Sequence, residues 1–74
     1  MSVPRHVYIN KIRELGYFYK AQQRRTFLYR LRGGLDFISV PRSEDLEDAW
    51  VETTLKRAGL TEEEAKKFIG AAKT

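Results

Sequence analysis

The segment Arg32-Gly33-Gly34-Leu35 constrains the fold of this chain more than any other part of its sequence. It separates two runs rich in aromatic and β-branched residues, at positions 26–29 and 35–40. A Gly-Gly pair supplies the positive φ angles that a tight hairpin turn needs. Pro41 ends the second run because proline cannot donate a hydrogen bond to a sheet ladder. The sequence therefore predicts an antiparallel hairpin here, and the aromatic run at 17–19 predicts one more strand before it.

A helix is expected before these strands. Ser2 and Pro4 fit a helix start, because serine can cap a helix and proline is tolerated in its first turn. Tyr8 and Ile12 then recur at helical spacing, and Gly16 ends the pattern. The first helix is therefore predicted to run from the N-terminus of the chain to Gly16.

Helical patterns return after the strands. The acidic residues within positions 43–48 suit the approach to a helix N-terminus, and Gly59 ends that helix. Thr61 followed by Glu64 forms a capping box, in which each side chain satisfies a backbone N–H of the other residue. A last short helix carrying Phe68 is expected to follow.

Together these elements predict an α+β fold in a single domain over residues 1–74. The order is α-β-β-β-α with an additional C-terminal helix, and a three-stranded antiparallel sheet is covered on one face by helices. Alternation along the second strand places Phe27, Tyr29 and Leu31 on the buried face and Thr26, Leu28, Arg30 and Arg32 outside. A shift of the strand by one residue would turn every side chain to the opposite face of the sheet. The third strand has apolar residues at both sets of alternating positions, so its buried face is not predicted.

The composition excludes several kinds of chemistry. Without cysteine there is no disulfide, thiolate zinc site or cysteine nucleophile, and the single histidine, His6, excludes sites that need a histidine pair. The acidic residues at 44–48 lack EF-hand spacing, so we expect no metal, no cofactor and no small-molecule substrate. No apolar run reaches about 18 residues, so a cytoplasmic protein outside the membrane is expected.

The charge distribution points to a polyanion. Residues 1–42 carry nine basic and two acidic side chains, whereas residues 43–74 carry five basic and eight acidic ones. Arginine supplies planar donors for phosphate, and aromatic rings stack on unpaired bases. The basic residues interleaved with aromatic ones in the predicted sheet are Lys20, Arg24, Arg25, Arg30, Arg32 and Arg42. The first five are the expected phosphate contacts, with Tyr19 and Tyr29 as stacking residues.

Two other interpretations remain open. The aromatic residues could be core and the arginines could simply keep a small sheet in solution. The basic surface could also serve as a protein-interaction module that meets an acidic partner.

The segments at 15–17, 28–29, 33–34, 38–42 and 54–64, in this order and spacing, carry a resemblance to a known family. Over roughly residues 9–64 the chain resembles the HicA-type toxin family, whose fold is like that of double-stranded-RNA-binding domains. The resemblance implies a toxin–antitoxin component that binds RNA and a HicB-like antitoxin.

Family members cut messenger RNA with a histidine in a Gly-Ser-His-like segment. That histidine position falls on Thr26 here, and Arg24 and Arg25 replace the preceding glycine. Threonine cannot take a proton from a 2′-hydroxyl near pH 7, so the catalytic assignment is not carried over. We therefore expect an RNA-binding protein without histidine-based cleavage, and rank an active ribonuclease with a relocated site last.

Overall fold

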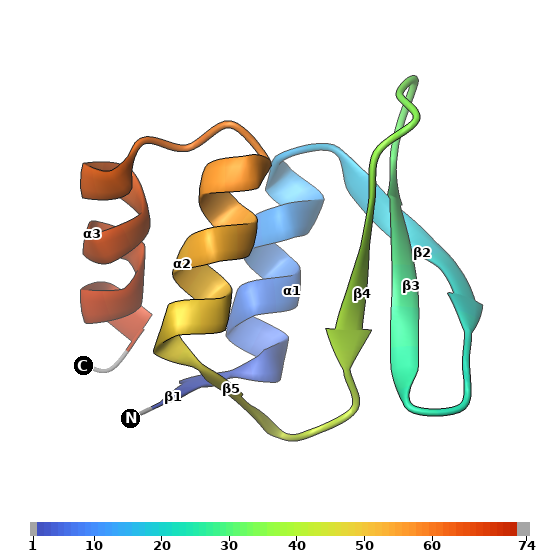
Figure 1. The fold of residues 1–74 in the computed structure, drawn as a ribbon, viewed down its shortest axis with the longest axis horizontal. Helices are drawn as coiled ribbons and strands as arrows, with labels where there is room; N and C mark the ends of the chain where they lie inside the picture. The colour runs from blue at the N-terminus through green and yellow to red at the C-terminus, as the bar shows by residue number, and fades with distance from the viewer. Residues whose placement is uncertain (1, 73–74) are drawn as a thin grey trace.

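The computed structural model describes residues 2–72. In chain order its elements are β1 (Ser2–Pro4), α1 (Arg5–Glu14), β2 (Tyr17–Gln22), β3 (Thr26–Leu31), β4 (Phe37–Pro41), β5 (Asp45–Glu47), α2 (Asp48–Arg57) and α3 (Glu62–Ala72). The helices gather on one side of the β2-β3-β4 sheet, and α3 lies farthest from it (Figure 1). The predicted α+β fold with a three-stranded antiparallel sheet is confirmed.

The register of the sheet fixes which side chains share a face. β3 lies in the centre and pairs antiparallel with both β2 and β4. Phe18 lies opposite Arg30, which in turn lies opposite Phe37, so these three residues form one row across the sheet. The β2–β3 register shifts between Tyr19 and Ala21, which places a bulge at Lys20.

The phase predicted for the central strand is confirmed. Tyr29 is only 8% exposed and belongs to the core, and Phe27 and Leu31 pack against that core. Arg30 is exposed and Leu28 is half-buried, as expected for the opposite face of a strand with period two. The face of the sheet turned away from the helices is called the outer face below.

The two ends of the helical layer differ from the prediction. Ser2 is the start of β1 rather than a helix cap, and residues 45–47 form β5 rather than an acidic approach to a helix. The two strands pair with Val3 opposite Leu46, and both side chains are buried. This pairing joins segments more than 40 residues apart, so no local pattern in the sequence signals it.

The loop between β3 and β4 is longer than the expected tight hairpin. Of the glycine pair predicted to adopt positive φ angles, Gly33 does so with a φ of +75° and Gly34 does not, and β4 starts at Phe37 rather than Leu35. A Cβ atom on Gly34 would lie 2.8 Å from a methyl carbon of Leu31, so any larger residue there would require the Leu31 side chain to shift. The N–H of Leu31 donates to the carbonyl of Asp36 at 2.9 Å, which closes the longer loop.

Asp36 ties this loop to the helical side of the molecule. Its carboxylate accepts a hydrogen bond of 2.8 Å from the Tyr17 hydroxyl and lies 3.9 Å from the guanidinium of Arg57. Arg57 also donates to the carbonyl of Phe37 at 2.9 Å. The only carboxylate of the three strands and their two connecting loops is thereby directed away from the outer face.

Helices α2 and α3 complete the core. The predicted capping box is confirmed, since the Glu64 N–H donates to Thr61 Oγ1 and the Thr61 N–H donates to Glu64 Oε1. Ile12, Val51 and Leu55 are fully buried between the helices and the sheet. Within residues 2–72 no helix has the length and apolar character required to cross a bilayer.

Candidate nucleic-acid interface

The basic side chains of the first half of the chain fall into two groups rather than one platform. Arg5, Arg24, Arg25 and Arg42 meet at the end of the sheet that carries the β2–β3 turn, and this group is called the arginine end. Arg30 and Arg32 lie toward the opposite end, beside Phe18 and the β3–β4 loop.

Arg42 holds the arginine end together. Its guanidinium donates to the carbonyl of Arg24 at 3.4 Å, and its backbone N–H donates to the carbonyl of Arg25 at 3.2 Å. The guanidinium of Arg5 donates to the carbonyls of Arg42 and Ser43. These bonds draw the start of α1, the β2–β3 turn and the end of β4 into one place.

Phe27 supplies the floor of the arginine end. The guanidinium carbons of Arg5 and Arg42 lie 5.2 and 5.5 Å from the centre of its ring. Both distances fall within the range of cation–π attraction, which partly offsets the repulsion between two like charges. The ring of Tyr19, 52% exposed, lies 6.4 Å from that of Phe27 and extends this aromatic surface toward solvent.

The positive charge of the arginine end is not neutralised within the described chain. The four ion pairs found among residues 2–72 involve Lys56, Arg57 and Lys66 as the cations. Glu44 and Asp45 line a hollow of about 340 Å³ beside Arg5, yet neither pairs with a guanidinium of the described residues. A group of arginines without carboxylate partners produces a positive potential that attracts anions.

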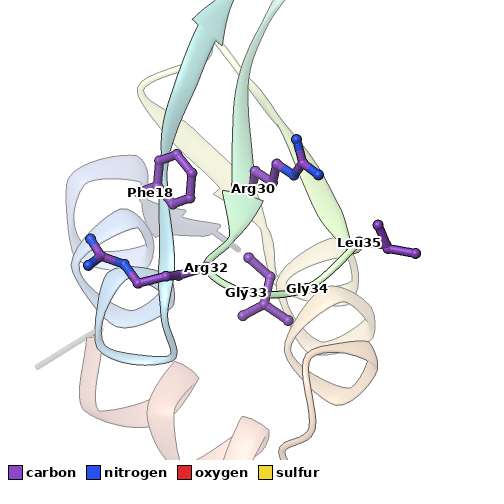
Figure 2. Close-up of a pocket in the computed structure, with 7 residues that line it drawn as sticks. Phe18, Arg30, Arg32, Gly33, Gly34 and Leu35 are labelled. Atoms are coloured by element: carbon purple, nitrogen blue, oxygen red, sulfur yellow. The ribbon is translucent and has the colours of Figure 1, made fainter.

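The second basic group lies on the outer face. Arg32 places its guanidinium 5.9 Å from the ring centre of Phe18. Figure 2 shows Phe18 over β2, with the guanidinium groups of Arg30 and Arg32 extending to opposite sides. The open hollow around these residues has a volume of about 590 Å³ and is bordered by Leu35 of the β3–β4 loop.

The remaining predicted site residues occupy different environments. Lys20 is exposed at the bulge of edge strand β2. Tyr29 lies in the core, and burial raises the pKa of its hydroxyl. Its ring is covered by the helical side of the molecule and does not reach the outer face. Of the two expected stacking residues, only Tyr19 therefore offers an exposed ring.

The residue at the family's histidine position and the chain's one histidine lie in different surroundings. The hydroxyl of Thr26 donates to the side-chain oxygen of Gln23 at 3.0 Å, across the β2–β3 turn. His6 is exposed near the start of α1 and borders the small hollow beside Arg5. Among residues 2–72 no three His, Asp or Glu side chains lie close enough together to hold a metal ion.

Two residues of these surfaces were missed by sequence reasoning. Arg5 joins the arginine end across 37 positions of sequence, which no local pattern indicates. Phe18 was grouped with its neighbours Tyr17 and Tyr19, although alternation turns it to the other face. The hairpin register, once known, pairs Phe18 with Arg30 and would have identified it.

Comparison of the chain with protein-family models, with curated proteins and with solved structures found no match. The assignment of function therefore rests on the surfaces described above and on the motifs of the sequence.

Proposed function

We propose that this protein is a small RNA-binding protein of the cytoplasm, related to the HicA-type toxins, that binds RNA through the phosphates. The arginine end is the principal contact, with Tyr19 available to stack on an unpaired base beside it. Lys20, Arg30 and Arg32 add positive charge along the sheet.

The observation that carries this proposal is the absence of any ion pair at the arginine end among the described residues. Holding the guanidinium groups of Arg5 and Arg42 over one ring, beside the β2–β3 turn that carries Arg24 and Arg25, costs free energy through repulsion, and an anion bound there recovers it. The side chains of Arg24 and Arg25 form no hydrogen bond or ion pair within residues 2–72, so their planar donors are available for phosphate oxygens.

Binding without cleavage is the form of the proposal that the chemistry favours. The position of the family's histidine holds Thr26, whose neutral hydroxyl is too weak a base to abstract a proton near neutral pH. Arginines there can hold a phosphate and stabilise its charge, but they remain protonated. A protein that binds RNA without cleaving it acts by occupying the RNA or together with an antitoxin.

A second candidate is a docking module for a protein such as a HicB-like antitoxin. The exposed apolar side chains of Phe37 and Leu35 favour it, because a contiguous apolar patch often marks a protein interface. This candidate predicts co-purification of one specific protein and little affinity for RNA.

The test is a binding titration with a fluorescently labelled single-stranded RNA, read by fluorescence anisotropy. The R24Q/R25Q variant removes two charges from the arginine end. If both residues contact phosphates, its affinity at about 0.1 M salt falls roughly tenfold or more.

The matched control is K66Q/K67Q, which removes the same charge from α3, far from the sheet (Figure 1). Its affinity should stay within about threefold of the native value. Equal losses of RNA affinity in the two variants would mean that net charge alone accounts for binding. No loss of affinity in R24Q/R25Q would refute the proposal.

A further inference from the structure

We propose that the outer face of the sheet is a base-stacking platform that makes the protein prefer single-stranded over double-stranded nucleic acid. Its central row is Phe18, Arg30 and Phe37, with Arg32 beside Phe18. This inference rests on the proposed RNA-binding function and adds the substrate class to it.

The row consists of two aromatic rings on either side of one guanidinium. Phe18, Arg30 and Phe37 lie opposite one another on β2, β3 and β4. Since neighbouring strands lie about 4.8 Å apart, the two phenylalanines are roughly 10 Å apart with Arg30 between them. Such a row offers a ring to each of two bases and a phosphate donor between them.

Both rings are open to solvent. Phe18 is 36% exposed and Phe37 is 54% exposed, although helices cover the other face of the same strands. Exposing two phenylalanines on this face is unfavourable in a protein that binds nothing there, because it leaves apolar area in water. Their exposure indicates an occupant with flat apolar faces.

The charge of the outer face identifies that occupant. The strand residues that accompany the central row on this face are Thr26, Leu28, Ser39, Ala21 and Pro41, none of which is acidic. Asp36, the one acid within residues 17–41, is engaged by Tyr17 and Arg57 on the helical side. An apolar face whose only charges are positive complements bases joined by phosphates.

Arg30 and Arg32 are suited to follow the backbone of such a strand. The Arg30 guanidinium forms no ion pair or hydrogen bond within residues 2–72, and Figure 2 shows it extending away from Phe18. Arg32 rests on the Phe18 ring in the free protein, 5.9 Å from its centre. An arriving base takes that ring face, and Arg32 turns to a phosphate.

A flat platform discriminates between single and double strands for a geometric reason. Bases within a duplex are stacked on one another and present only their edges in the grooves, whereas unpaired bases present their faces. A duplex can reach the arginines with its phosphates but cannot reach the phenylalanine rings with its bases.

The experiment compares three labelled or competing ligands: a single-stranded RNA of about twelve nucleotides, the duplex formed from it, and inorganic polyphosphate, which has no bases. The F18A/F37A variant should bind the single strand at least about thirtyfold more weakly, since each of the two stacks is worth roughly five- to 150-fold. Its affinity for polyphosphate and for the duplex should stay within about twofold of the native values.

The F18L/F37L variant keeps apolar side chains without a π-face. It should lose affinity for the single strand as the alanine variant does; if it keeps native affinity, apolar contact alone acts there and stacking is overturned. A Phe37→Trp variant adds a direct measurement, because single-stranded RNA should quench its new emission, with the native protein's Trp50 emission as the baseline.

Unchanged single-strand affinity in F18A/F37A, with polyphosphate still bound, would overturn the platform while leaving phosphate binding intact. If F18A/F37A keeps its affinity for the single strand but loses a dimer that the native protein forms in analytical ultracentrifugation, the outer face would instead be a dimer interface. Native protein that binds neither RNA nor polyphosphate would refute the proposed function and this inference together.

Discussion

Single residues decide how the charges of this protein are grouped. The sequence allowed the prediction that arginines are interleaved with aromatic residues, but not which of them meet. Arg42 bonds to the carbonyl of Arg24 and shares the Phe27 ring with Arg5, and both contacts join distant parts of the chain. Phe27 and Tyr29 share the helical face of β3, but Tyr29 belongs to the core, whereas Phe27 is only partly buried and contacts the two guanidinium groups.

Tyr8 gives a prediction at this scale. Burial raises the pKa of Tyr8 to about 12, and its hydroxyl donates to Thr54 Oγ1 at 2.8 Å. The folded state thus holds this proton more tightly than the unfolded chain, whose tyrosines ionise near pH 10. The stability that Tyr8 contributes is present below pH 10 and is lost as pH rises toward 12, by roughly 2 kcal/mol.

The measurement is the urea midpoint of unfolding at pH 9 and at pH 11.5 for native protein and Tyr8→Phe. The variant should be about 1 kcal/mol less stable at pH 9, where it lacks the bond to Thr54. It should lose less stability than the native protein on going to pH 11.5. An equal loss of stability between pH 9 and pH 11.5 in the two proteins would contradict the account of Tyr8. Burial also raises the pKa of Tyr17 to about 12, and because both proteins keep Tyr17, its effect is the same in each.

Secondary-structure elements divide into those with a local signal and those without one. The hairpin glycines, the alternation of β3 and the capping box of α3 each act over a few residues, so the sequence predicts them. Strands β1 and β5 form because Val3 and Leu46, far apart in the sequence, pair and are buried together. Segments of three residues are too short to show a strand periodicity. β1 ends at Pro4 and α1 begins at Arg5. The position of β1 therefore also sets the position of Arg5 at the arginine end.

Leu46 tests whether the β1–β5 pair supports the fold. Leu46→Ala removes a buried side chain and should lower the free energy of unfolding by about 2–4 kcal/mol. Leu35→Ala is the matched control, because Leu35 is 89% exposed and its loss should cost less than about 0.5 kcal/mol. Urea unfolding followed by circular dichroism measures both. Similar stabilities for the two variants would show that the β1–β5 pair contributes little.

At the scale of the whole molecule, the fold places the acidic start of α3 away from the arginine end. The arginine end lies where the β2–β3 turn meets the start of α1, whereas the acidic first turn of α3, residues 62–64, lies on the side of α2 away from the sheet (Figure 1). From the sequence, only the different net charges of the two halves of the chain can be predicted. Placing them in space requires the sheet register and the β1–β5 pairing. Glu44 and Asp45 border the hollow beside Arg5, but within residues 2–72 neither pairs with a guanidinium of the arginine end, so a phosphate chain can bind there without breaking an ion pair.

The salt dependence of RNA binding tests this account most directly. If the four side chains of the arginine end each contact a phosphate, the affinity for single-stranded RNA should fall with a log–log slope at least as steep as about −2.8, or at least roughly fiftyfold between 50 and 200 mM salt. R24Q/R25Q should make the slope shallower by about 1.4, and K66Q/K67Q should leave it at the native value. A native slope near zero, or one that R24Q/R25Q leaves unchanged, would contradict the assignment of the arginine end to phosphate binding.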